Sequence, residues 1–331
     1  MFPDPFRLDA IDSAKGIGIL LVVFGHAWRG AHSAGLLADE ALFQAIDFAV
    51  YAFHMPLFFF LSGLLFLETL GKYTASTSLK GRLTRLLWPM VLWSWIFFGL
   101  KLAAGSSANT PVTLADFPII PLPPFEHLWF LWALFLCQTL LVFGYVAGGG
   151  CLPATRLRWL LAAGALLFAL VNPYISVPSL LWGPMFEHLP YFLAGIAAGG
   201  ILSCRMPLWA GFICTSAFAA LVWAVQGEKA SVLHSLGLIA FGWGAWLCAD
   251  RGVGAGQAHT TLRFLRAIGQ ASMAIYLTHT VFAAGLRIIL LKSGVENVSV
   301  ILLATVVIGI IAPVAMGRCA QRLRLTKLLG F

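Results

Sequence analysis

Residues 15–28 of this chain of 331 residues read KGIGILLVVFGHAW, an apolar stretch that begins with Lys15 and carries His26 near its end. A helix that crosses a lipid bilayer needs about 20 mostly apolar residues, and this stretch with its flanks has that length. Ionisable side chains are costly inside such a helix, so each one there is a candidate functional residue. The stretch therefore predicts a membrane fold with a polar site inside it.

Composition supports a membrane protein over the whole chain. Hydrophobic residues make up 60%, charged residues only 10%, and the mean hydropathy is +0.90, whereas a soluble domain has about 25% charged residues. The net charge of +8 is better explained by basic cytoplasmic loops than by binding to nucleic acid. The six cysteines show no CxxC pair and no ligand spacing, so we expect neither a disulfide framework nor a metal site.

Apolar runs of spanning length recur along the sequence. With the ten candidates below, sixteen of the 21 Lys and Arg residues fall on one side of the membrane, which the positive-inside rule makes cytoplasmic. We therefore expect an all-α integral membrane protein, a single domain over 1–331, with about ten transmembrane helices and both termini in the cytoplasm. The candidate spans are about 14–31, 46–69, 86–105, 128–147, 157–175, 187–202, 207–225, 233–249, 268–290 and 297–316.

Three histidines are expected at similar depth in these spans. His26 lies eleven residues beyond Lys15, or roughly 16 Å along a helix, and His54 and His279 lie at comparable positions in the second and ninth spans. Taken singly, each is better explained as a core histidine that hydrogen-bonds between helices. Their shared depth favours a common polar cavity, in which a neutral imidazole can act as a general base.

Two arginines stand at the cytoplasmic start of the third span, in the stretch KGRLTRLLWP. The spacing of three residues is expected to place Arg82 and Arg85 on one helix face. Such a pair suits a polyphosphate, because the guanidinium presents a planar fork of donors to phosphate oxygens. On spacing alone, an ordinary anchor at the lipid headgroups remains the more common explanation.

Two further stretches have both a structural and a functional interpretation. FHMPLFFFLSG ends in the small pair Ser62 and Gly63, which suits close helix packing or a smooth wall along which a slender chain lies. EHLWFLWALF begins at Glu126, which is either a solvated loop charge or part of a site, and its Trp129 fits the aromatic belt of a membrane interface.

Together these stretches resemble the acyltransferase-3 family of membrane acyltransferases, including its fucose 4-O-acetylase-like branch. The resemblance rests on five motifs in family order, from Asp12 to about residue 316. Lysine stands where many members have arginine in the first motif, which keeps the charge but loses the planar fork. The matching positions, motif by motif, are Lys15 and His26, Ser62 and Gly63, Arg82 and Arg85, Trp129, and Ser272, Tyr276 and His279.

The resemblance implies transfer of an acyl group, commonly acetyl, from cytoplasmic acyl-CoA to a hydroxyl of a glycan or lipid-linked sugar. We expect a bacterial-type cytoplasmic (inner) membrane protein that holds no permanent cofactor and uses acyl-CoA as co-substrate. The predicted catalytic base is His26. Predicted to bind acyl-CoA are Lys15, Arg82, Arg85, Ser62 and Gly63; candidates for the cavity or the acceptor are Asp12, His54, Glu126, Trp129, Ser272, Tyr276 and His279.

Two alternatives remain open from the residues. A transporter or flippase of a glycan or lipid intermediate also uses ionisable residues near the midplane, although the sequence has no visible inverted repeat and the motif order argues against it. An acyl-enzyme formed on Ser62 is less favoured than direct transfer, because no base with its orienting partner is apparent beside it. Asp12 is close enough to Lys15 in sequence to pair with it.

Overall fold

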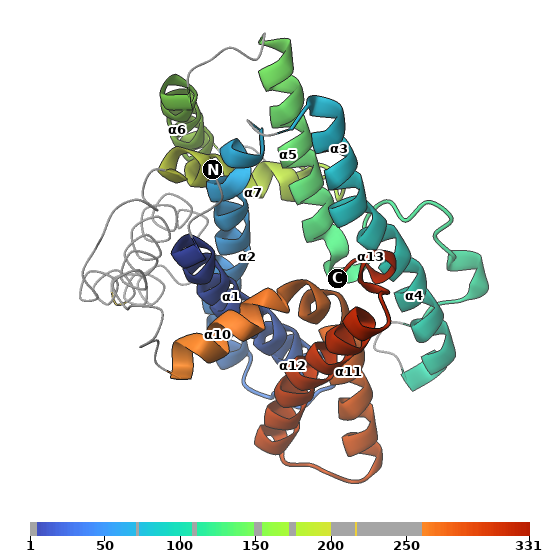
Figure 1. Cartoon of the computed structure of the whole chain (residues 1–331). Coiled ribbons are helices and arrows are strands. Elements are labelled where there is room, and N and C mark those ends of the chain that lie inside the picture. The colour runs from blue at the N-terminus through green and yellow to red at the C-terminus, as the bar shows by residue number, and fades with distance from the viewer. Residues whose placement is uncertain are drawn as a thin grey trace.

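The computed structural model describes residues 5–70, 73–107, 111–148, 154–171, 177–199, 216 and 260–331. Every regular element in these ranges is a helix, which confirms the all-α prediction (Figure 1). The longer helices are α1 (Pro5–Ser33), α2 (Glu40–Leu70), α3 (Ala75–Arg82), α4 (Trp88–Ala104), α5 (Trp129–Ala147), α6 (Ala154–Val171), α7 (Gly183–Ala197), α10 (Thr260–Gln270), α11 (Ser272–Lys292) and α12 (Val298–Arg322), followed by the short α13 (Thr326–Leu329).

Six helical stretches in the described part of the chain are long and apolar enough to cross a membrane. They match the first four and the last two predicted spans, and α6 and α7 coincide with the fifth and sixth. The predicted spans at 207–225 and 233–249 lie outside the described residues, apart from position 216. The total of ten spans and the cytoplasmic termini therefore stay predictions. The six stretches are Ile11–Ser33, Glu40–Leu67, Ala75–Ala104, Glu126–Ala147, Ser272–Lys292 and Val298–Arg322.

The third span is one long helix with a change of winding inside it. The side chain of Thr74 caps its start by accepting a hydrogen bond from the Thr77 amide. Between α3 and α4, residues Leu83–Leu87 form a π-helical turn, here η1. A π-helical turn has more residues per turn than an α-helix, so side chains three positions apart across it are rotated away from a shared face.

Helix α1 occupies the centre of the fold and packs against α2, α10, α11 and α12. In Figure 1 the orange α10 crosses the blue α1. Their backbones approach closely at Gly16 and Gly269, since a Cβ at either position would collide with the backbone of the other helix. The predicted ninth span began at 268, whereas the structure ends α10 at Gln270 and starts α11 at Ser272. The short α10 was not expected.

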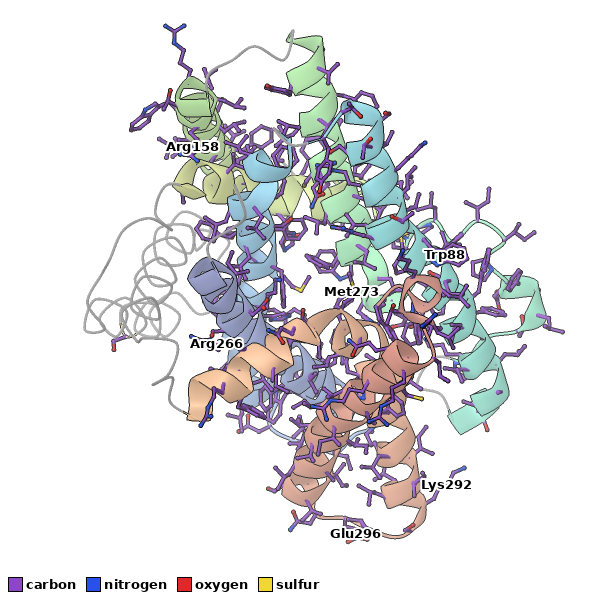
Figure 2. All side chains as sticks on the ribbon, viewed as in Figure 1. Trp88, Arg158, Arg266, Met273, Lys292 and Glu296 are labelled. Atoms are coloured by element: carbon purple, nitrogen blue, oxygen red, sulfur yellow. The ribbon has the colours of Figure 1, made fainter. Side chains whose placement is uncertain are left out.

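A second pair of helices, α2 and α7, packs alongside, and α5 contacts both. Their shared core is aromatic and fully buried at Phe59, Phe60 and Phe192. Figure 2 shows Arg158 on α6 at one end of the molecule and Lys292 at the tip of the α11–α12 hairpin at the other.

Candidate active site

Three histidine rings from three elements meet in the middle of the helix bundle. His26 comes from α1, His279 from α11, and His127 from a short 3-10 turn, η4 (Glu126–Leu128), that precedes α5. The ring centroids of His26 and His279 are 5.0 Å apart, those of His26 and His127 5.4 Å, and those of His127 and His279 5.1 Å. The prediction that His26 and His279 share a depth is therefore confirmed by direct contact.

His127 is held in this cluster by a reciprocal pair of bonds to α11. Its Nε2 donates to the backbone oxygen of Tyr276 at 3.0 Å, and the phenol of Tyr276 donates back to the backbone oxygen of His127. Both side chains are buried. Because these bonds join residues 149 positions apart, they fix η4 at the depth of the histidines, and α5 begins inside the bundle rather than at its outer edge.

A cavity of about 630 Å³ opens beside the cluster. His26, which is only partly buried, and His127 line it, so one edge of the histidine cluster is accessible from the cavity. Trp129 and Tyr276 also line it, as does Glu126 at the rim. Four of the predicted site residues therefore share one cavity, namely His26, Glu126, Trp129 and Tyr276.

Cationic side chains line the same cavity on the side away from Lys15. Arg29 pairs with Asp47 at 2.5 and 2.7 Å and stacks on the Tyr51 ring, whose centroid is 3.3 Å from the guanidinium carbon. Lys101 pairs with Glu126 across the cavity rim. These pairs order the rim, because charge-assisted hydrogen bonds fix both partners.

Arg287 on α11 adds a third cation to the cavity wall, and it is buried. Its guanidinium lies directly over Gly30, where any Cβ would collide with it. Gly30 is four residues beyond His26, one helical turn away. The absence of a side chain at Gly30 therefore lets Arg287 lie close to the histidine cluster.

His54 and His279 are buried behind the cavity rather than in its wall. The Nδ1 atom of His54 donates to the Val50 carbonyl at 2.6 Å, and its ring contacts Tyr51, with centroids 4.6 Å apart. The Nδ1 atom of His279 likewise donates to backbone oxygens one turn earlier in its helix. In both rings Nε2 is buried and has no hydrogen-bond partner among the described residues.

The remaining predicted residues on α1 and α11 lie away from the cavity. Lys15 pairs with Asp12 at 3.3 Å, which confirms the expected pairing near the start of the first span. Ser272 is the first residue of α11. None of these three side chains is part of the cavity wall described above.

Ser62 and Gly63 are also outside the cavity wall. The hydroxyl of Ser62 accepts a hydrogen bond from Gln138 of α5 at 2.9 Å. A Cβ at Gly63 would collide with the backbone oxygen of Phe192, and one at Gly195 with that of Phe60. Gly63 thus serves the close crossing of α2 and α7, one of the two interpretations of its motif.

Arg82 and Arg85 do not share the one helix face that their spacing predicted. Arg82 is buried, donates to the Ser78 backbone oxygen at 2.8 Å and lies 5.4 Å from the centroid of the Phe66 ring, whereas Arg85 is exposed. The physical reason is the π-helical turn, which begins directly after Arg82 and rotates Arg85 away. The expectation of a shared face was wrong.

Arg82 lines a second, smaller hollow of about 190 Å³ between α3 and α5. Two buried polar atoms in its walls, Arg82 Nε and Thr139 Oγ1, have no hydrogen-bond partner among the described residues. Buried polar groups in folded proteins are nearly always satisfied. The accessible wall of this hollow is nearly all apolar, so the two unsatisfied atoms lie behind its surface rather than facing it.

Sequence reasoning missed several residues of the cavity. His127 stands in the quoted stretch beginning at Glu126, but the expected span began at 128, which put His127 in an outer loop. Arg287 follows His279 by eight residues in an apolar helix, but it was not among the predicted site residues. An ionisable residue in such a helix is itself a functional signal, and that signal was present in the sequence.

The chain is similar in sequence to known proteins. Two relatives, both named nodulation protein NolL, match part of the chain: one from Sinorhizobium fredii is 32% identical over 171 residues, 51% of this chain and 44% of the relative. The other, from Mesorhizobium japonicum, is 28% identical over 177 residues, 52% of this chain and 43% of the relative. The matched region thus spans less than half the length of these relatives.

No solved structure is similar to the chain. A family model described as an acyltransferase domain matches residues 8–318, nearly the whole chain, and the chain therefore belongs to acyltransferase family 3.

Proposed function

We propose that this protein is a multi-pass O-acyltransferase of the cytoplasmic membrane. It moves an acyl group, acetyl in the first instance, from acyl-CoA to a hydroxyl of a glycan or lipid-linked sugar. The observation that carries the proposal is that His26, the histidine of the family's first-helix motif, lines a cavity of about 630 Å³ together with a second histidine. That volume is within the range of small-molecule sites, about 300–1,000 Å³.

In the proposed reaction His26 is the general base. One of its ring nitrogens takes the proton from the acceptor hydroxyl while the hydroxyl oxygen attacks the carbonyl carbon of the thioester. A carbon–oxygen bond forms, the carbon–sulfur bond breaks, and the proton passes from His26 to the departing CoA thiolate. The products are the ester and free CoA. General base catalysis of this kind contributes about 10²–10⁴-fold in rate.

The proposed donor site is at the end of the α2–α5 contact that is farther from the cavity. Arg82 and Arg85 bind the CoA phosphates, with Lys15 assisting. The support is that both arginines match the family's paired-arginine motif and that Arg85 is exposed. Along α2, Met55 lines the cavity and Phe66 contacts Arg82, eleven residues away, which is roughly 16 Å of helix.

Ser62 lies between these two positions on α2 and is bonded to Gln138 of α5. The pantetheine arm of acyl-CoA is slender and would have to pass between α2 and α5 to reach His26. In the described residues the two hollows have separate walls. We therefore propose that donor binding opens this contact, with the bond between Ser62 and Gln138 giving way to the arm.

The proposed acceptor site is the cavity itself. Sugars commonly stack on an indole ring and hydrogen-bond to charged side chains, and the wall supplies Trp129, Glu126 and Arg287. Tyr276 and His54 are engaged with backbone oxygens in the structure, which suits a supporting role for both.

The experiment that tests the proposal uses the purified protein in lipid nanodiscs with radiolabelled acetyl-CoA. We expect release of CoA that depends on an added acceptor and on His26. A transporter or flippase would consume no acetyl-CoA, and that outcome would overturn the proposal. Mass spectrometry of surface glycans from cells with and without the protein identifies the acceptor through a missing ester.

A further inference from the structure

Backbone hydrogen bonds determine the tautomers of two histidines in the cluster. His279 Nδ1 lies 2.8 Å from the Ile275 carbonyl oxygen and 2.9 Å from that of Tyr276. A carbonyl oxygen only accepts hydrogen bonds, so Nδ1 carries the proton. By the same reasoning His127 carries its proton on Nε2, which lies 3.0 Å from the Tyr276 oxygen. In the neutral rings, His279 Nε2 and His127 Nδ1 are therefore acceptors only.

His279 Nε2 requires a donor that the described structure does not otherwise supply. The residue is fully buried, with 0% exposure, and this nitrogen has no hydrogen-bond partner among the described residues. A buried acceptor without a donor is destabilising. His127 cannot provide the hydrogen, because its single N–H is already given to Tyr276. Within the cluster only His26, whose ring centroid is 5.0 Å away, has an N–H to donate.

In the structure the rings of His26 and His279 are neighbours, with centroids 5.0 Å apart, but no hydrogen bond joins them. We infer that His279 is a positioning residue for His26: a rotation of the His26 ring brings one of its N–H groups to His279 Nε2, which accepts the hydrogen. This inference rests on the proposed function of His26. The bond selects the His26 tautomer whose other nitrogen, with its lone pair, is directed to the cavity. That nitrogen is the one that takes the proton of the acceptor hydroxyl, while the proton shared with His279 stays in place.

The two neighbours of His26 thereby have different roles. His127 lines the cavity, so its acceptor nitrogen is accessible to water or substrate, whereas His279 is fully buried and is not part of the cavity wall. In known catalytic triads, the base is held by a third group that does not touch the substrate. Here a neutral imidazole, whose own N–H is fixed by the helix backbone, takes the place of the carboxylate.

The kinetic test compares His279→Leu with His279→Gln. Leucine removes the acceptor, and we expect kcat to fall by about 10²-fold, the lower part of what a general base contributes. The KM for acetyl-CoA should stay within about twofold, because no donor-binding contact is removed. Glutamine offers a carbonyl oxygen at a similar reach to Nε2, and it should recover kcat to within about tenfold of wild type.

The matched control is His188→Leu on α7. His188 is also buried and also bonds its Nδ1 to the backbone oxygen four residues earlier, that of Pro184 at 2.9 Å. Its ring contacts Phe59 and Trp129 rather than His26, so any effect through Trp129 appears in the KM of the acceptor. Its loss should change stability without the kcat defect. An unchanged kcat in His279→Leu, or a glutamine variant no better than leucine, overturns the inference.

A second measurement does not depend on activity. Nuclear magnetic resonance of the ¹⁵N-histidine-labelled protein reports which ring nitrogens carry protons and which accept hydrogen bonds. We expect the unprotonated nitrogen of His279 to be shielded as in a hydrogen bond, and its resonance to move in His26→Ala but not in His188→Leu. A His279 resonance that is the same in wild type and in His26→Ala overturns the inference. If the wild-type protein never transfers acetyl groups, the proposed function is overturned instead. The resonance measurement then still decides whether His279 accepts a hydrogen bond from His26.

Discussion

Tyr276 and His127 bond to each other twice: the phenol donates to the His127 backbone oxygen, and His127 Nε2 donates to the Tyr276 backbone oxygen at 3.0 Å. The pair joins the connection before α5 to the second turn of α11 and so places two cluster histidines, His127 and His279, side by side. The cavity therefore depends on a contact that involves no reacting group.

Tyr276→Phe tests this dependence. The change leaves the ring in place but removes one donor, so the buried His127 oxygen loses its partner, at a cost of about 1–3 kcal/mol. We expect a lower thermal midpoint and a reduced kcat, since η4 is no longer held against α11. Tyr73→Phe, at a residue 57% exposed, is the control and should change neither quantity. A Tyr276→Phe protein with unaltered stability and rate would show that the remaining bond suffices.

His26→Ala tests the assignment of the base. We expect acetyl transfer to fall by about 10²–10⁴-fold, while membrane insertion and equilibrium binding of acetyl-CoA stay as in wild type. Binding measured by calorimetry in detergent provides the second readout. Near-normal transfer by this variant is incompatible with His26 as the general base, and His127, the other histidine in the cavity wall, would then be the next residue to test.

Arg85→Ala tests the phosphate contact. Arg85 is exposed on the π-helical turn between α3 and α4. Losing a charge-assisted hydrogen bond of about 1.5–3 kcal/mol should raise the KM for acyl-CoA by roughly tenfold to 10²-fold, with little change in kcat. Arg156→Ala removes another exposed cation, on α6, and controls for general electrostatic attraction. Equal donor KM values in the two variants would remove Arg85 from the donor site.

The sequence predicted the helices better than the site, for a physical reason. Apolar periodicity and length identify spans without any knowledge of contacts, and depth along a span placed His26 and His279 together. Depth along a span could not predict the position of His127. That position depends on the bond to Tyr276, because His127 precedes α5 and does not lie within a membrane-spanning helix that starts at the membrane surface. Only a tertiary contact reveals that α5 starts inside the bundle.

The predicted shared face of Arg82 and Arg85 failed for a related reason. Assigning one face to Arg82 and Arg85 assumed α-helical winding, but the five residues from Leu83 to Leu87 wind as a π-helix. Nothing in the composition of LTRLL distinguishes the two windings, since they differ by a single hydrogen-bond register. The burial of Arg82 and the exposure of Arg85 follow from that register.

Gly63→Ala separates the two interpretations of the aromatic–Ser–Gly motif. A methyl group there collides with the Phe192 backbone oxygen, and overpacking of this kind costs about 1–3 kcal/mol. If Gly63 serves packing, the thermal midpoint falls and the KM for acyl-CoA of the folded fraction is unchanged. If Gly63 is also a wall of the donor path, that KM rises in addition to the loss of stability. Gly99→Ala on α4 is the control, because nothing lies within 4 Å of the added Cβ, and alanine in an exposed helix should be neutral or slightly stabilising. From the close crossing of α2 and α7 we expect the first outcome.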